Sequence, residues 1–135
     1  RIIREAEGDP ERTVMSHIDR TIFDVEQILQ LAETGCYVEF DLFGQESSHY
    51  PLGPIDMPND AMRVGYLMSL MHAGYGDKLV IAQDICTKVH LSKYGGEGYN
   101  HILENVVPIM KRKGMSPQEV ETILARNPAC ILTIK

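Results

Sequence analysis

Short β-prone runs alternate with segments of helical periodicity, and this alternation constrains the possible folds of the chain more than any other feature. The strand-like runs lie near 13–17, 37–41 and 79–84. Between the first two, apolar side chains recur at helical spacing in Val25, Ile28, Leu29 and Ala32. Strands that alternate with helices form parallel sheets, because each crossover returns the chain to the same end of the sheet. The sequence therefore predicts an α/β fold.

The chain is too short for the sheet that its strands indicate. The run 79–84 is typical of a strand covered on both faces, whereas a small open sheet exposes its edges. A closed (β/α)8 barrel has no edges, but it needs about 250 residues, and this chain has 135. The opening residues 1–7 are charged and lack an initiator methionine. We therefore expect a fragment cut from a longer chain.

Composition argues against several classes of function. The 13 Lys and Arg residues are outnumbered by 19 Asp and Glu residues, for a net charge of −6, which argues against nucleic acid as a partner. No stretch approaches the roughly 20 apolar residues needed to span a bilayer, so we expect no membrane partner. The 3 cysteines are widely spaced, which favours a reducing, cytoplasmic compartment.

Two of the predicted strands end in side chains that can bind a metal. His17 closes the first run and Asp84 closes the last. The carboxyl ends of parallel strands converge on one site, and an imidazole with a carboxylate suits a metal such as zinc. The alternative is structural, with His17 bonded to a loop backbone and Asp84 capping a turn. Two ligands are too few for a catalytic metal, so the rest of such a site would lie elsewhere.

Three separated motifs resemble the phosphotriesterase family of the amidohydrolase superfamily. Residues 16–21 (SHIDRT) are similar to the metal-ligand motif on strand six of that family. The residues AQD at 82–84, with YGGEGY at 94–99, resemble its strand-eight aspartate and the following loop. Asn127 and Pro128 match its C-terminal NP signature. The motifs occur in the family's order, and the resemblance, strongest to vertebrate members, spans essentially the whole chain.

The resemblance implies a (β/α)8 barrel with a two-metal centre, of which residues 1–135 would be the C-terminal part, roughly the last three βα units. His17 would bind metal on strand six. Asp84 would bind metal on strand eight and take a proton from the attacking water as the catalytic residue. The family's other ligands lie on strands one, four and five, and none of them is in this chain.

The resemblance therefore also implies a function. It is that of a hydrolase for a small ester, lactone or amide, with two divalent metals, expected to be zinc, in the complete site. The isolated chain would be inactive. The alternative from another class is a non-catalytic truncated product, which acts as a binding or self-associating module through exposed sheet edges.

Candidate substrate contacts lie near the mouth of the expected site. Arg20 stands where many family members carry an acidic residue that relays a proton, and it could instead pair with an anionic substrate group or form a surface salt bridge. The loops 44–59 and 85–99 are longer than the ordinary connection of about four to six residues. In the second loop, Lys88 and Tyr94 could meet a polar or anionic substrate, or Lys88 could simply be solvated.

Prolines and a capping box predict the C-terminal helices. Pro108 is expected to begin a helix, because its ring disfavours the α conformation in the preceding residue. Residues 116–119 (SPQE) form a capping box that begins another helix, which we expect to end near Arg126. Asn127 and Pro128 would then begin a last short helical segment.

Overall fold

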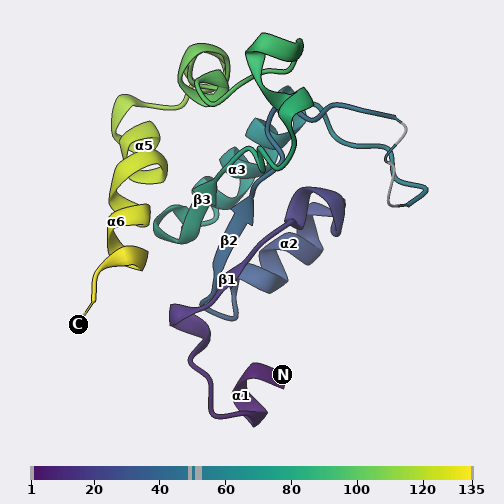
Figure 1. Cartoon of the computed structure of the whole chain (residues 1–135). Helices are drawn as coiled ribbons and strands as arrows, with labels where there is room; N and C mark the ends of the chain where they lie inside the picture. Colours follow the sequence, from purple (N-terminus) through teal and green to yellow (C-terminus); the bar gives the residue numbers. More distant parts are fainter. Residues whose placement is uncertain (1, 49, 51–52, 135) are drawn as a thin grey trace.

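A three-stranded parallel sheet forms the centre of the chain (Figure 1). The computed structural model describes residues 2–48, 50 and 53–134. Strands β1 (Val14–Met15), β2 (Tyr37–Phe40) and β3 (Leu79–Ile81) pair in the order β1-β2-β3, so each strand lies beside its successor in the sequence. Sequential parallel neighbours joined by helices are the arrangement of a (β/α)8 barrel. The predicted α/β fold and its three strands are confirmed.

Helices α2 (Val25–Ala32) and α3 (Asp60–His72) cover one face of this sheet. Asp24 caps α2, because its carboxylate accepts hydrogen bonds from the backbone N–H groups of the first turn. Val38 and Phe40 alternate along β2 and therefore face the same side, where they join the apolar core formed with both helices. The candidate site residues follow the carboxyl ends of these packed strands.

The remaining elements are short. Helix α1 (Ile2–Glu5) precedes the sheet and extends away from it in Figure 1. Single 3-10 turns lie at Pro10–Arg12, Ile18–Arg20, Gly76–Lys78, Lys88–His90 and Ser92–Tyr94.

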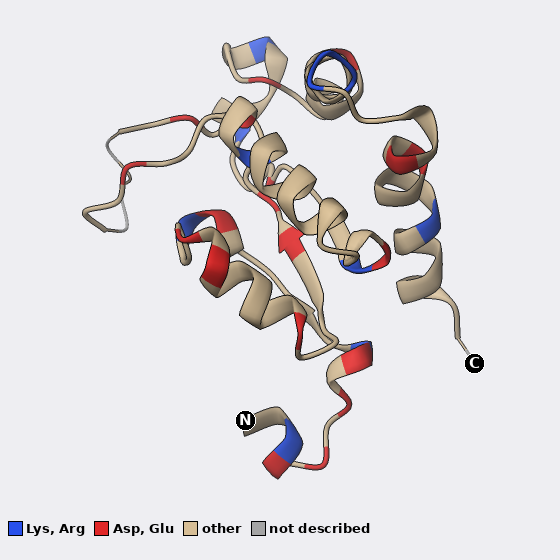
Figure 2. Cartoon of the chain, turned by 180° about the vertical axis from the view of Figure 1, so that it is seen from behind, with Lys and Arg blue, Asp and Glu red and all other residues tan. Residues whose placement is uncertain are grey.

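None of the helices that the structure describes has the length and apolar character needed to traverse a bilayer. Figure 2 shows basic and acidic positions interspersed along the chain.

Two longer helices follow the sheet, and both contain a proline in their interior. A π-helical segment, Ile102–Val106, leads directly into α4 (Val107–Arg112). The capping box begins α5 (Pro117–Glu121) as predicted, and a second π-helical segment, Thr122–Arg126, joins α5 to α6 (Asn127–Leu132). At each junction the backbone N–H bonds to the carbonyl five residues back.

The expectation that Pro108 begins a fresh helix is wrong, because the segment Ile102–Val106 runs into α4 without a break. Asn127 and Pro128 do open the last short helical segment, α6, as expected, although α6 continues directly from Thr122–Arg126. Each proline follows a π-helical turn by one residue, inside a continuous helix. A proline lacks an N–H and crowds the turn before it, and the wider π-helical turn accommodates both effects. Sequence rules for proline describe regular α-helices, so they place a boundary where the structure has a π-bulge.

Asn127 joins the last helix to the start of β3. Its side chain is buried and donates to the Gly76 carbonyl at 2.8 Å and to the Leu79 carbonyl at 2.6 Å. We expect Asn127→Ala to lower the free energy of unfolding by about 1–3 kcal/mol, because it leaves buried carbonyls without a donor. Chemical denaturation of the purified protein measures this. Thr133→Ala is the control, because its exposed hydroxyl donates to a carbonyl of its own helix; equal losses for the two variants would contradict the prediction.

Candidate active site

His17 and Asp84 lie at the same edge of the sheet, just beyond the carboxyl ends of β1 and β3. Both have left-handed backbone conformations, with φ of 60° for His17 and 46° for Asp84. Among the described residues only one other non-glycine, Glu7, has a positive φ. Such conformations are costly for ordinary residues and concentrate at functional sites. The two predicted metal ligands thus share a strained backbone conformation that is common at functional sites.

Asp41, which follows β2, is a candidate site residue that the sequence analysis did not single out. Nδ1 of His17 lies 2.7 Å from Oδ2 of Asp41, and the His17 backbone N–H donates to Oδ1 at 3.2 Å. Burial raises the pKa of the Asp41 carboxyl, and the hydrogen bond with His17 opposes that rise. The sequence does contain a signal for Asp41, which is its position. Asp41 closes the middle strand-like run, just as His17 and Asp84 close the outer two.

This pairing suits a metal-binding histidine. Histidine ligands usually turn one ring nitrogen to a carboxylate, which orients the ring and fixes its tautomer. With Asp41 beside Nδ1, the nitrogen left for a metal is Nε2. Within residues 2–48, 50 and 53–134, however, no group of three or more His, Cys, Asp or Glu side chains is arranged to hold a metal ion. The described residues therefore fit part of a metal centre and do not form a whole one.

A buried arginine lies behind this edge of the sheet. Arg63, on α3, is fully buried, and its Nε lies 2.8 Å from Asp19 Oδ2 and its Nη1 2.8 Å from Asp60 Oδ1. His101 Nε2 approaches the other oxygen of Asp60 at 2.6 Å. We call Asp19, Asp60, Arg63 and His101 the arginine network. Arg63 thus pairs with both buried carboxylates, as buried charges require partners, while Oδ1 of Asp19 has no hydrogen-bond partner among the described residues.

The arginine network also holds the loops that carry the site. Asp19 accepts a hydrogen bond from the Leu42 backbone at 3.1 Å, Asp60 accepts one from Gly44 at 2.9 Å, and Arg63 donates to the Gln45 carbonyl at 2.8 Å. The loops after β1 and β2 are therefore fixed to each other through side chains. This arrangement positions His17 and Asp41, which lie on those loops. Sequence reasoning missed Arg63, because it stands among apolar residues on a helix.

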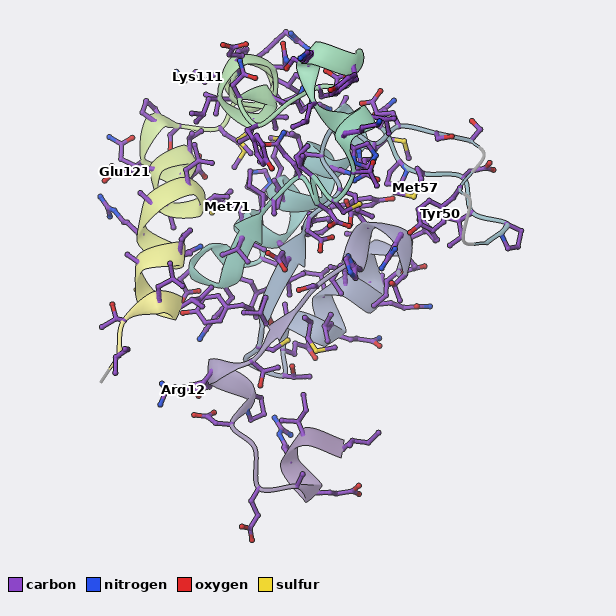
Figure 3. All side chains as sticks on the ribbon, in the orientation of Figure 1. Arg12, Tyr50, Met57, Met71, Lys111 and Glu121 are labelled. Atoms are coloured by element: carbon purple, nitrogen blue, oxygen red, sulfur yellow. The ribbon has the colours of Figure 1, made fainter. Side chains whose placement is uncertain are left out.

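A cavity of about 670 Å³ opens beside Asp84. Arg20 also lines it, as do Tyr50 and Met57 from the long loop after β2, both labelled in Figure 3. The described lining residues do not include His17. Asp84 and Arg20 thus face one space that a small molecule could enter.

Lys88 and Tyr94 lie on the loop after β3, outside the described lining of this cavity. The Lys88 and Lys93 ammonium groups lie 5.8 Å and 5.7 Å from the centroid of the Tyr94 ring. All three side chains are exposed. These contacts are cation–π interactions within the loop, and a role for Lys88 and Tyr94 in substrate binding stays a prediction.

Comparison with known proteins identifies the family. Residues 1–132 match the phosphotriesterase family. The chain belongs to the phosphotriesterase family. Over 136 aligned residues it is 52% identical to the N-acetyltaurine hydrolase of Tetraodon nigroviridis, and the alignment covers 100% of this chain and 39% of that relative. The chain thus spans well under half the length of the curated relatives that it matches.

Solved structures of phosphotriesterase-like proteins share the fold. A resiniferatoxin-binding protein from Rhodobacter sphaeroides superimposes with a TM-score of 0.91 at 27% identity, over 96% of this chain and 36% of that protein. The phosphotriesterase homology protein of Escherichia coli, solved with phosphate in its active site, gives 0.84 at 26% identity, over 98% of this chain and 42% of that protein. These likenesses confirm the predicted partial (β/α)8 barrel. Enzymes of the phosphotriesterase family are metal-dependent hydrolases.

Proposed function

We propose that this chain is the C-terminal part of a binuclear metal-dependent hydrolase that cleaves a small amide, with esters and lactones as the chemical alternatives. The observation that carries the proposal is the His17–Asp41 contact at 2.7 Å, at the sheet edge that also bears Asp84. The last strands of this family's barrel would contribute to the metal centre a histidine oriented by a carboxylate and, from a strand two places further along the sheet, an aspartate.

Each residue has a definite task in the proposed reaction. When bound, two divalent metals, expected to be zinc, lower the pKa of water and polarise the scissile carbonyl. His17 would hold a metal through Nε2, and Asp41 would keep the imidazole in the required tautomer. Asp84 would bind metal through one carboxylate oxygen and accept a proton as the general base. The arginine network would keep the loops that carry His17 and Asp41 in register.

The relatives favour an amide among the possible substrates. Those at about half identity are named N-acetyltaurine hydrolase, and the scissile bond of N-acetyltaurine is an amide. Sequence likeness at this level supports the reaction class and leaves the substrate of this chain to be tested.

Metal content and turnover test the proposal together. A protein that extends this chain upstream to a complete barrel should bind about two zinc ions per chain and hydrolyse N-acetyltaurine. Chelation should abolish that turnover, and added zinc should restore it. The isolated chain should be inactive, because it supplies only His17 and Asp84 as ligands. Turnover of any amide, ester or lactone by the isolated chain with added zinc would contradict the proposal.

The second candidate is a non-catalytic product that self-associates. The sheet order leaves β1 and β3 as outer strands, and unpaired strand edges can recruit further chains. Sedimentation of the isolated chain distinguishes the two candidates. Concentration-dependent oligomers together with no metal binding would favour self-association, whereas a monomer would not.

The proposed setting is the cytoplasm, and the proposed partner is a small-molecule substrate. All three cysteines, Cys36, Cys86 and Cys130, are free thiols. Free thiols persist in reducing compartments, which supports this location.

A further inference from the structure

Arg20 is a half-buried cation that faces the same cavity as Asp84. It lies on the 3-10 turn Ile18–Arg20, which follows His17 directly. Among the described residues, Arg20 is the only lysine or arginine that lines the cavity. A molecule that entered would therefore meet one fixed positive charge in the cavity that Asp84 also lines.

The contacts of Arg20 orient its guanidinium without neutralising it. Nη1 donates to the Tyr50 hydroxyl, and the guanidinium carbon lies 5.6 Å from the centroid of the Tyr50 ring. In the described part of the chain, no carboxylate forms an ion pair with Arg20. A guanidinium carries five N–H donors in a planar fork, so most of them remain for a ligand.

The other charged groups of the cavity do not replace this role. Glu97 lines the cavity, and its Oε2 lies 3.1 Å from Nδ1 of His101, a residue that is not part of the described lining. Asp84 is the proposed metal ligand and base. An oxyanion would therefore be attracted to Arg20, and arginine pairs with oxyanions through two parallel hydrogen bonds.

The geometry points to Arg20 as the residue that selects substrates whose amine portion carries an oxyanion, such as a sulfonate or carboxylate. This inference rests on the proposed amide hydrolysis. The scissile amide would lie at the Asp84 end of the cavity and the oxyanion against Arg20. The volume of about 670 Å³ lies in the range of roughly 300–1,000 Å³ that is usual for small-molecule sites.

The test compares an anionic amide with a neutral one in the full-length protein. We expect Arg20→Met to lower kcat/KM for N-acetyltaurine about 100-fold, mainly through KM, and to change that for N-propylacetamide less than about threefold. For Arg20→Lys, kcat/KM for N-acetyltaurine should lie between the values for the wild type and Arg20→Met, because lysine keeps the positive charge and lacks the planar fork of N–H donors. Arg12→Met removes one positive charge at the far side of the chain from Tyr50 (Figure 3). This variant should leave kcat/KM for both amides unchanged.

Equal losses on both amides, or no loss on either, would overturn the inference and leave the proposed hydrolysis intact. Calorimetric binding of ethanesulfonate tests Arg20 without turnover. We expect binding to Arg20→Met to be about tenfold weaker than to the wild type. If the wild type hydrolyses neither amide, the proposed function fails, and the calorimetry alone decides on Arg20. If neither the wild type nor Arg20→Met binds ethanesulfonate, or if both bind it equally, the proposed role of Arg20 is refuted.

Discussion

Replacing Arg63 by methionine is expected to lower the free energy of unfolding by about 3–5 kcal/mol, because two buried carboxylates lose their cation. Arg63 and Asp19 have fully buried side chains, and Asp60 is 4% exposed. Denaturation by urea, followed by circular dichroism, measures the loss. The matched control is Arg126→Met, because the Arg126–Glu121 pair is 61% and 56% exposed and such pairs contribute about 0–1 kcal/mol.

The same substitution should weaken metal retention in the full-length protein. Asp19 binds the Leu42 backbone beside Asp41, and the Arg63 network links that loop to the one that carries His17. Loss of the network therefore releases both partners of the His17–Asp41 contact. Zinc content after dialysis is the measurement. If Arg63→Met and Arg126→Met lose equal stability and retain equal zinc, the network does not hold the site.

The strands and the fold class could be predicted because their signals are local. A β-prone run such as 79–84 shows its burial in consecutive residues, and α2 shows its apolar face within a few turns. Strand ends then locate His17 and Asp84 at one edge without any knowledge of contacts. The family motifs led to the barrel, since three parallel strands alone are compatible with several α/β folds.

The arginine network could not be predicted, because its members are far apart in the sequence. Arg63 and Asp19 are separated by 44 positions, and His101 and Asp60 by 41. No periodicity links such residues, and an arginine on an apolar helix suggests solvent exposure until its partners are known. Asp41 could more nearly be predicted, because in the sequence it closes a strand-like run as His17 and Asp84 do. Unlike them, it lies in no family motif.

Arg20 shows where motif and structure complement each other. The motif marks it as a departure from the family, and the structure adds its contact with Tyr50 and its place in the cavity. Tyr50 lies 30 positions away on a loop without regular structure, so no sequence pattern joins the two.

Asp84→Asn is expected to lower kcat of the full-length hydrolase about 1,000-fold, because an amide cannot accept the proton that a carboxylate takes as general base. Asparagine is the right replacement for the backbone. Asp84 has a φ of 46°, and asparagine tolerates the left-handed region as aspartate does, so the loop should keep its conformation. Any loss then reflects the missing carboxylate rather than a refolded loop. Hydrolysis of N-acetyltaurine at saturating zinc measures it.

Metal analysis separates the two tasks proposed for Asp84. Full zinc content with a large loss in kcat would mean that the carboxylate acts mainly as a base, and loss of zinc would mean that it acts mainly as a ligand. The control is Asp56→Asn, the same chemical change at an exposed position outside the described cavity lining. If Asp84→Asn keeps kcat within about tenfold of the wild type, Asp84 is not the base, since such bases contribute at least about 100-fold.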